Sequence, residues 1–325
     1  MKLAFTVVSV SFLGTAKIMA DSLRKHNPDY HVVFGIVDKI EGRIDQELFK
    51  NYELIEIDKI GISGFEELLK KYNIYELCSM SKCFFAEYLL KKYPQIAEII
   101  YIDADVLVFD SFAHIETELQ SNDIILSPHI LSPYNDFAFP RETFHLNVGV
   151  FNGGFFALRR SPETWKFLDW WQNRLRHFGY ENLLDGMFMD QLWLNFVPLF
   201  FKNVLVEQHL GINCAYWNIH ERQFSVNKEG KFVVNNEFPL IFFHYSGYKT
   251  SKPNDIATMD RYNLENRPDL RPIFKIYHDS LIEIKAAEFQ KLPNLLLGKP
   301  AYLKYGKLRD FALRVARKTL RMLHG

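Results

Sequence analysis

Apolar runs alternate with amphipathic stretches over roughly the first 130 residues of the chain. Residues 1–14 contain an apolar, β-branched run, residues 15–26 have the pattern of an amphipathic helix, and residues 31–38 form a second apolar run. This order predicts a β-α-β unit whose first strand is buried. A signal peptide is the less favoured interpretation of the N-terminus, because Thr6, Ser9 and Ser11 interrupt its apolar run.

The same patterns predict further elements up to about residue 292. Strands are expected at residues 54–57, 98–102, 106–109, 123–127, 147–158 and 240–245, with a hairpin formed by residues 224–226 and 231–234. Helices are expected at residues 64–72, 76–93, 161–176, 189–196 and 273–292. We therefore predict an α/β fold, a mixed and mostly parallel sheet with helices on both faces. We divide the chain into one α/β domain, residues 1–268, and a C-terminal helical region, residues 269–325.

Charge changes this picture only at the C-terminus. Lys plus Arg and Asp plus Glu are equal at 39 each, so net charge predicts no nucleic-acid partner. Residues 301–325, however, hold seven basic residues and a single acid. Within residues 304–323 these bases alternate with apolar residues near helical spacing, which predicts a basic amphipathic helix on an anionic membrane surface. The alternatives are packing on the chain's own domain or on a partner subunit, as in a homo-oligomer.

Cysteine usage and hydropathy bear on the cellular compartment. The three cysteines form no C-x-x-C pair, and the chain has no N-x-S/T sequon. Both features favour a reducing, cytoplasmic setting. No apolar run approaches the roughly 20 residues needed to cross a bilayer. We therefore predict a cytoplasmic protein that lies peripherally at the inner face of the membrane.

The clearest chemical motif is a pair of aspartates that interrupts an apolar run. Asp103 and Asp105 lie between Ile102 and Val106. In an extended chain, side chains two residues apart point to the same face. Such a pair at the carboxyl end of a strand suits a hard divalent cation that also binds phosphate oxygens. A solvated turn is the alternative, although exposed acids rarely interrupt a core run.

A second candidate is His244, which ends the apolar part of PLIFFHYSG. It is either a core histidine with satisfied nitrogens or a third ligand, since imidazole suits Mn²⁺ and other transition ions. Gly247 allows close approach of the backbone to a ligand, and Lys249 or Lys252 supplies a positive charge for phosphate. Together with the carboxylate pair, these residues predict a site for a metal–diphosphate group.

Four motifs in order resemble family 8 of the GT-A glycosyltransferases, over roughly residues 1–255. They are YIDADVLVFDSF, FNGGFFAL, MDQLWLN and HYSGYKTSKP. Lys82 stands where that family usually has an arginine near the nucleotide. Two features depart from the family pattern. The spacing from His244 to the Lys-Pro pair is two residues longer, and Ser9 and Ser11 replace the usual acidic–aromatic nucleotide signature.

The resemblance implies a GT-A fold and a nucleotide-sugar donor, a UDP-sugar, held through Mn²⁺ or Mg²⁺ by Asp103, Asp105 and His244. It implies that Asp190 and Gln191 are catalytic, that Gln191 faces the anomeric carbon, and that the reaction proceeds with retention. A helix N-cap is the alternative role for Asp190. The residues expected to contact the donor are Ser9, Lys82, Asp103, Asn152, Gly154, Gly247, Lys249 and Lys252.

Two aromatic segments, residues 132–145 and 215–222, are candidates for contact with the acceptor. The residues predicted to make it are Tyr134, Phe139, Tyr216, Trp217 and Asn218. Since the chain has 29 phenylalanines, core packing explains these aromatics equally well.

We weigh three functions. The favoured one is a metal-dependent glycosyltransferase that acts on a glycan or lipid-linked acceptor in bacterial surface polysaccharide synthesis. A sugar-1-phosphate nucleotidyltransferase needs a Gly-rich, Arg-bearing loop after the first strand, which residues 11–15 match poorly. A non-catalytic carbohydrate-binding protein on the same fold need not keep the aspartate pair and His244.

Overall fold

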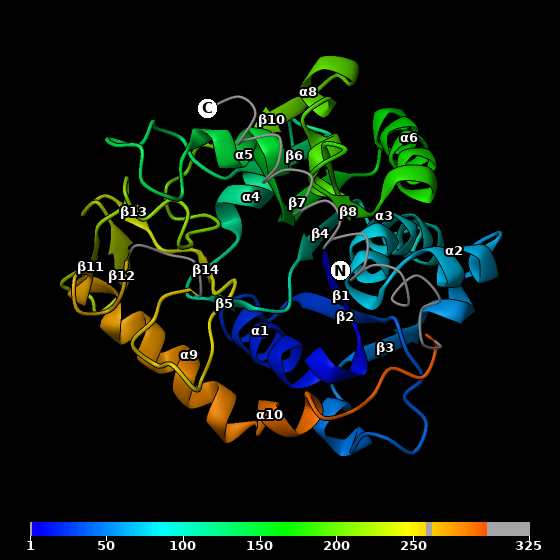
Figure 1. The fold of residues 1–325 in the computed structure, drawn as a ribbon, viewed down its shortest axis with the longest axis horizontal. Coiled ribbons are helices and arrows are strands. Elements are labelled where there is room, and N and C mark those ends of the chain that lie inside the picture. The colour runs from blue at the N-terminus through cyan, green and yellow to red at the C-terminus, as the bar shows by residue number, and fades with distance from the viewer. Residues whose placement is uncertain (1, 258–261, 298–325) are drawn as a thin grey trace, which may run out of the picture.

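A seven-stranded mixed sheet forms the centre of the protein. The computed structural model describes residues 2–257 and 262–297 (Figure 1). The strand order is β10-β6-β7-β4-β1-β2-β3, and β7 is antiparallel to both of its neighbours while the other pairs are parallel. The strands are β1 (Lys2–Val8), β2 (Tyr30–Ile36), β3 (Glu53–Glu56), β4 (Glu98–Ile102), β6 (Ile124–Pro128), β7 (Phe151–Arg159) and β10 (Val204–Val206). The predicted fold class is confirmed.

Alternate residues of each central strand enter two separate cores. Leu3, Phe5 and Val7 of β1 pack into the core beneath α3 (Ile74–Lys92) and α6 (Pro162–Phe178). Ala4 and Val8 pack on the other face with α1 (Leu13–His26). Because side chains alternate along a strand, this pattern buries both faces of the sheet.

The helices begin where their sequences provide caps. Asn73 and Glu76 form a capping box at the start of α3, and Ser161 caps α6 one residue before Pro162. The remaining helices are α2 (Phe65–Lys71), α4 (Ala113–Leu119), α5 (Glu142–Val148), α7 (Gln191–Leu194), α8 (Val197–Phe200), α9 (Arg271–Glu283) and α10 (Ala286–Phe289). Short 3₁₀ turns lie at Val10–Phe12, Gln46–Phe49, Ile57–Ile60 and Pro268–Leu270.

Two predictions of element boundaries were wrong. The strand expected at residues 147–158 begins only at Phe151, because Asn147 and Val148 belong to α5. The reversal needs Gly149, which has a φ of 117°, a value that L side chains rarely adopt. The helix expected at residues 273–292 is two helices, separated at Lys285, which has a φ of 55°.

Three small sheets flank the central one. β5 (Val106–Val108) pairs antiparallel with β14 (Phe242–His244), and this pair carries part of the site described below. β11 (Phe224–Val226) and β12 (Phe232–Val234) form the predicted hairpin, which β13 (Phe238–Pro239) extends to three strands. β8 (Glu181–Asn182) and β9 (Met187–Phe188) form the third sheet.

The C-terminal helices pack against α1. α9 and α10 run along one side of the molecule below α1, drawn in orange in Figure 1. Phe289 of α10 contacts Gly14 and lies edge-on to Phe49. The division at residue 268 stays a prediction, and the predicted basic helix at residues 304–323 lies outside the described residues. Within residues 2–257 and 262–297, no helix is both long and apolar enough to span a bilayer.

Candidate active site

Asp103 and Asp105 lie in the turn between β4 and β5, at the carboxyl end of a central strand. Pairing of β5 with β14 places His244 opposite Val106, next to both aspartates. The Tyr245 N–H donates to the Asp105 carbonyl oxygen at 2.8 Å, which holds the two segments together. Three side chains far apart in the sequence are thereby brought to one point.

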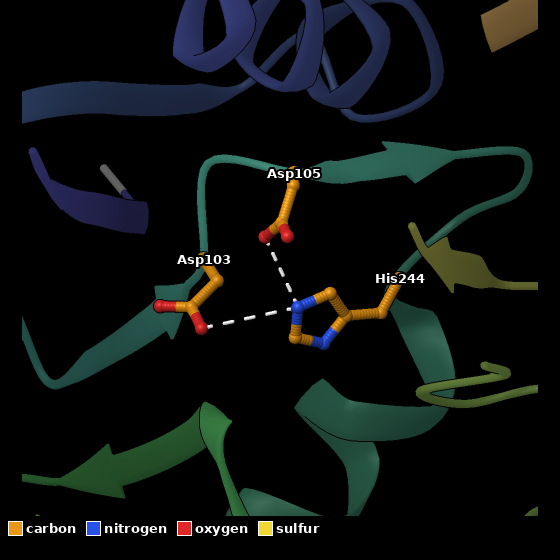
Figure 2. Close-up of side chains that lie close together, drawn as sticks. All are labelled: Asp103, Asp105 and His244. Atoms are coloured by element: carbon orange, nitrogen blue, oxygen red, sulfur yellow. Dashed lines mark ion pairs between the residues drawn. The ribbon is translucent and has the colours of Figure 1, made fainter. Parts of the chain in front are cut away.

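The three side chains point toward one another, as Figure 2 shows. His244 Nε2 lies 3.0 Å from Asp105 Oδ1 and 3.9 Å from Asp103 Oδ2. One ligand atom from each residue falls within 4.8 Å of the other two. Two carboxylate oxygens and an imidazole nitrogen are a donor set that suits Mn²⁺.

Electrostatics couple His244 to its acidic neighbours. Burial alone lowers the pKa of His244, but the charge and hydrogen bond of Asp105 outweigh burial, and the pKa is raised above its usual 6.5. The pKa of Asp105 is lowered in turn, because His244 outweighs the desolvation of the carboxylate. The arrangement therefore favours a positive charge between the carboxylates, supplied by a proton or by a cation.

Gly154 of β7 leaves the space that this cluster occupies. A Cβ at this position would lie 2.5 Å from His244 Cε1 and 2.8 Å from Asp103 Oδ2. The Asp103 N–H also donates to the Gly154 carbonyl oxygen at 2.8 Å. Any side chain here would displace Asp103 or His244, so this position requires glycine.

Lys82 of α3 is buried and joins two carboxylates. Its Nζ lies 3.0 Å from Asp190 Oδ2 and 3.3 Å from Asp103 Oδ1, and donates to the Gly153 carbonyl oxygen at 2.9 Å. Burial would lower the pKa of Lys82, but Asp103 and Asp190 outweigh burial and raise it. The pKa of Asp190 is itself raised, chiefly by burial, with Lys82 opposing. Lys82 thus holds Asp190 close to Asp103.

Gln191 is the first residue of α7, and its side chain contacts β7. Its Oε1 accepts from the Gly153 N–H at 3.2 Å, and its Nε2 donates to the Val148 carbonyl oxygen at 2.8 Å. Asp190 lies at the N-cap position of α7, but its side chain makes no capping hydrogen bond. The alternative role of a capping side chain is therefore not observed. Both side chains are instead directed at the cleft between β7 and α3.

A pocket of about 300 Å³ opens over these groups. The predicted site residues among its lining are Ser9, Lys82, Asp103, Asp105, Asn152, Gly154, Asp190, Gln191, Tyr216, Trp217 and His244. Ser9 lies at its β1 end, where its Oγ is 2.7 Å from Ser11 Oγ. Tyr216 and Trp217 also line the pocket.

The other predicted site residues do not line this pocket. Gly247 has a φ of 78°, and it opens the loop that carries the exposed Lys249 and Lys252. Lys252 lies 3.8 Å from Asp255. Assignment of either lysine to phosphate stays a prediction.

Three of the predicted acceptor residues also lie away from the pocket lining. Tyr134 is buried, and its hydroxyl donates to the Trp217 carbonyl oxygen at 2.5 Å. Asn218 is fully buried and donates to the carbonyl oxygens of His129 and Asn213, both at 3.0 Å. Burial leaves neither side chain a surface for stacking on a sugar. Phe139 is 40% exposed.

Sequence reasoning did not find several residues of the site. Tyr75 and Cys78 of α3 line the pocket, and Gly153 binds both Lys82 and Gln191 through its backbone. Asn213 contacts His244 and Asn152. The glycine pair in FNGGFFAL is a usable signal for Gly153, but no local pattern distinguishes Asn213 from the other asparagines.

Comparison with known proteins identifies the family. The family described as glycosyl transferase family 8 matches residues 4–253. The chain belongs to glycosyl transferase family 8. It is therefore a glycosyltransferase, and family membership favours this function over the nucleotidyltransferase and the non-catalytic binding protein.

Two relatives in Bacillus subtilis (strain 168) are similar to this chain over most of their length. The chain is 25% identical to YfnF of Bacillus subtilis (strain 168), an uncharacterised protein, over 86% of this chain and 91% of YfnF. Identity to the uncharacterised YfnD of the same organism is 23%, over 84% of this chain and 86% of YfnD.

Among solved structures, galactosyltransferase LgtC, crystallised with donor and acceptor sugar analogues, matches with a TM-score of 0.50 and 17% identity. The match covers 90% of this chain and 98% of LgtC. The bifunctional glycosyltransferase WbbM has a TM-score of 0.50 and 13% identity, over 90% of this chain and 52% of WbbM. These matches support the GT-A fold.

Proposed function

We propose that the protein transfers a hexose from a nucleotide-diphosphate sugar, a UDP-sugar, to a glycan or lipid-linked acceptor. The observation that carries the proposal is the convergence of Asp103, Asp105 and His244 at the base of a pocket of about 300 Å³. Membership of family 8 supplies the reaction class. The two carboxylates and the imidazole suit a divalent cation, and a cation of this kind also binds the oxygens of a diphosphate.

The cluster fits a divalent cation, Mn²⁺ or Mg²⁺. Its oxygens are hard ligands, His244 adds a nitrogen that suits Mn²⁺, and Gly154 leaves room around them. When bound, the cation neutralises charge that develops on the departing diphosphate. The His244 side chain is buried, and those of Asp103 and Asp105 are partly exposed to the pocket.

In the proposed reaction the bond from the anomeric carbon to the phosphate oxygen breaks, and a bond to the acceptor oxygen forms on the same face. The acceptor proton passes to the leaving phosphate. No strong base is required, which agrees with an Asp190 held by Lys82 and a Gln191 held by two backbone groups. We assign Gln191 to the face of the anomeric carbon and Asp190 to the sugar.

Positive groups beyond the cation complete the donor site in this proposal. The loop after β14 carries Lys249 and Lys252, which we assign to the phosphates. Ser9 and Asn152 line the pocket, and we assign them to the nucleotide and sugar. We assign Tyr216 and Trp217, which also line the pocket, to the acceptor. We further propose a role in surface polysaccharide synthesis at the inner face of the membrane, from the basic sequence of residues 304–323.

Thermal shift with a panel of nucleotide sugars tests the proposal, with and without Mn²⁺, on wild type, Asp105→Ala and the control Asp279→Ala. Asp279 is exposed and pairs with Lys275, away from the pocket. One UDP-sugar should raise the melting temperature of wild type and Asp279→Ala in the presence of Mn²⁺ only, and should not affect Asp105→Ala. A shift that is independent of both metal and Asp105 would contradict the metal-dependent donor site. NMR of the anomeric proton of the product tests retention.

A further inference from the structure

Asn213 lies directly behind the metal-ligating histidine. It is fully buried and has a φ of 51°, a left-handed conformation that asparagine tolerates better than most residues. The next residue, Cys214, forms a β-bridge with Phe243, and the His244 N–H donates to the Cys214 carbonyl oxygen at 2.7 Å. The backbone therefore fixes Asn213 beside His244.

The side-chain amide of Asn213 makes three polar contacts. Its Oδ1 lies 3.3 Å from His244 Nδ1, and its Nδ2 donates to Asn152 Oδ1 at 3.1 Å and to Ser127 Oγ at 3.2 Å. The ring nitrogen that faces Asn213 is the one that does not face the carboxylates. Asn213 thus connects the histidine on β14 to β6 and β7.

A backbone donor fixes the direction of these hydrogen bonds. The Gly154 N–H donates to Asn152 Oδ1 at 3.0 Å, so that oxygen can only accept. Asn213 must then turn its Nδ2 toward Asn152 and its Oδ1 toward His244. Asn152 Nδ2 in turn faces His129 Nε2 at 3.2 Å. Burial lowers the pKa of His129 to about 3, so its ring is neutral, and the tautomer protonated at Nδ1 accepts from this amide.

The consequence is a single permitted tautomer for a neutral His244. Because Asn213 Oδ1 is an acceptor, Nδ1 of His244 carries the proton and donates it. Nε2 is then left with its lone pair directed at Asp103 and Asp105, where the proposed cation would lie. Ligating histidines commonly depend on such a partner for ring orientation and basicity.

We propose that Asn213 is a positioning residue for the cation, one that fixes the tautomer and the ring orientation of His244. The inference rests on the proposed function, since it requires that Asp103, Asp105 and His244 bind a divalent cation. Asn213 is also connected to Asp103 through Gly154. Asn152 Oδ1, which accepts from Asn213, also accepts from the Gly154 N–H, and the Gly154 carbonyl oxygen accepts from the Asp103 N–H.

The Asn213→Gly variant tests this role, because glycine accepts the left-handed backbone and removes the side chain together with its amide. The control is Asn236→Gly, the same change at an exposed asparagine with a φ of 57°. We would measure the Kd of Mn²⁺ by electron paramagnetic resonance in the presence of UDP. Asn213→Gly should raise the Kd about 10- to 100-fold, while Asn236→Gly should leave it unchanged.

A second variant separates positioning from folding. Asn213→Asp keeps an oxygen for the His244 Nδ1–H and should recover part of the lost affinity. In ¹⁵N-histidine spectra with Mg²⁺, wild type should show His244 protonated at Nδ1, and Asn213→Gly should lose that protected proton.

The outcomes distinguish the two proposals. If wild type binds no Mn²⁺, both the proposed function and this inference fail. If wild type binds Mn²⁺ and folded Asn213→Gly binds it equally well, only the inference is overturned. If Asn213→Gly does not fold, Asn213→Asp decides the question. ¹⁵N-histidine spectra of Asn213→Asp that show His244 protonated at Nε2 would overturn the inference.

Discussion

Lys82 holds two carboxylates together inside the protein, and its removal should be costly. The ammonium group and Asp190 are both buried, at 3.0 Å from each other. Lys82→Met leaves an unpaired buried carboxylate, and we expect a loss of about 3–5 kcal/mol in the free energy of unfolding. Urea denaturation at neutral pH measures this loss.

Two further variants check the cause. In Lys82→Met combined with Asp190→Asn, both charges are gone, so most of the lost stability should return. Lys275→Met removes an exposed partner of Asp279 and should change stability very little. If Lys82→Met proved no more destabilising than Lys275→Met, the buried pair would contribute nothing to stability.

His244 should make the stability of the metal-free protein depend on pH. Its pKa in the folded state is raised above 6.5 because Asp105 outweighs burial, so the folded protein holds a proton that the unfolded chain releases. The stabilisation is fully present below pH 6.5 and is lost as pH rises through the folded-state pKa.

Urea unfolding in EDTA, over about pH 6 to 9, measures this dependence. Wild type should lose stability across the range, and His244→Gln should show a flatter profile. The exposed His177 provides a control, since His177→Gln should behave as wild type. Parallel profiles for wild type and His244→Gln would refute the coupling of His244 to Asp105.

The sequence revealed those site residues whose signal is local. Asp103 and Asp105 interrupt an apolar strand, and His244 ends one, so each is visible in a short window. Lys82 was predicted to contact the donor, and that role stays a prediction; the sequence did not predict its ion pairs with Asp190 and Asp103. Such partners are brought together only by tertiary packing, since Lys82 lies on α3, Asp103 follows β4 and Asp190 precedes α7, and no short window contains all three.

At the scale of elements, the contact of α10 with α1 depends on Gly14. A Cβ there would lie 2.8 Å from Phe289 Cδ2 and 3.2 Å from Ala286 Cα. Gly14→Ala should therefore loosen α10, even though alanine favours the helix itself. We expect faster amide exchange over residues 286–297, measured by mass spectrometry, with the central sheet unchanged.

A compensating change tests whether the clash is responsible. Phe289→Leu, combined with Gly14→Ala, removes the ring atom that the new methyl group would meet. Protection of residues 286–297 should return in the double variant. Equal exchange in wild type and Gly14→Ala would mean that the contact does not hold α10.

Element boundaries were less predictable than element types. α3, α6 and the β11–β12 hairpin follow from caps and turns in their own sequences. The strand at residues 147–158 was placed too early, because Val148 and Phe151 are both apolar and continue one run. The break between α5 and β7 comes at Gly149, where a Cβ would lie 3.1 Å from the Gln191 carbonyl oxygen, a tertiary contact.

For the whole molecule, unequal charge along the chain predicts salt-dependent membrane binding. Residues 301–325 hold seven of the 39 basic residues and only one acid. The full chain should sediment with vesicles that contain anionic lipid and should not sediment with neutral vesicles. The bound fraction should fall as the salt concentration increases.

A neutralised tail provides the matched variant. Changing Arg314, Arg317, Lys318 and Arg321 to glutamine removes four charges, each worth about 1 kcal/mol near the surface, so binding should weaken about a thousandfold. Thermal stability should not change. Unaltered sedimentation of this variant would exclude residues 304–323 as the electrostatic anchor.

Because β14 follows all strands of the central sheet in the sequence, the ribosome completes the sheet before it adds His244. The last strand of the central sheet ends at Val206, whereas the third side chain of the proposed metal site is His244. At about 5–20 residues per second, a ribosome needs about 2–8 s to add the intervening residues. Every strand of the sheet has therefore been synthesised for seconds before the chain contains Asp103, Asp105 and His244 together, so during translation the proposed cation site is completed after the scaffold that carries it.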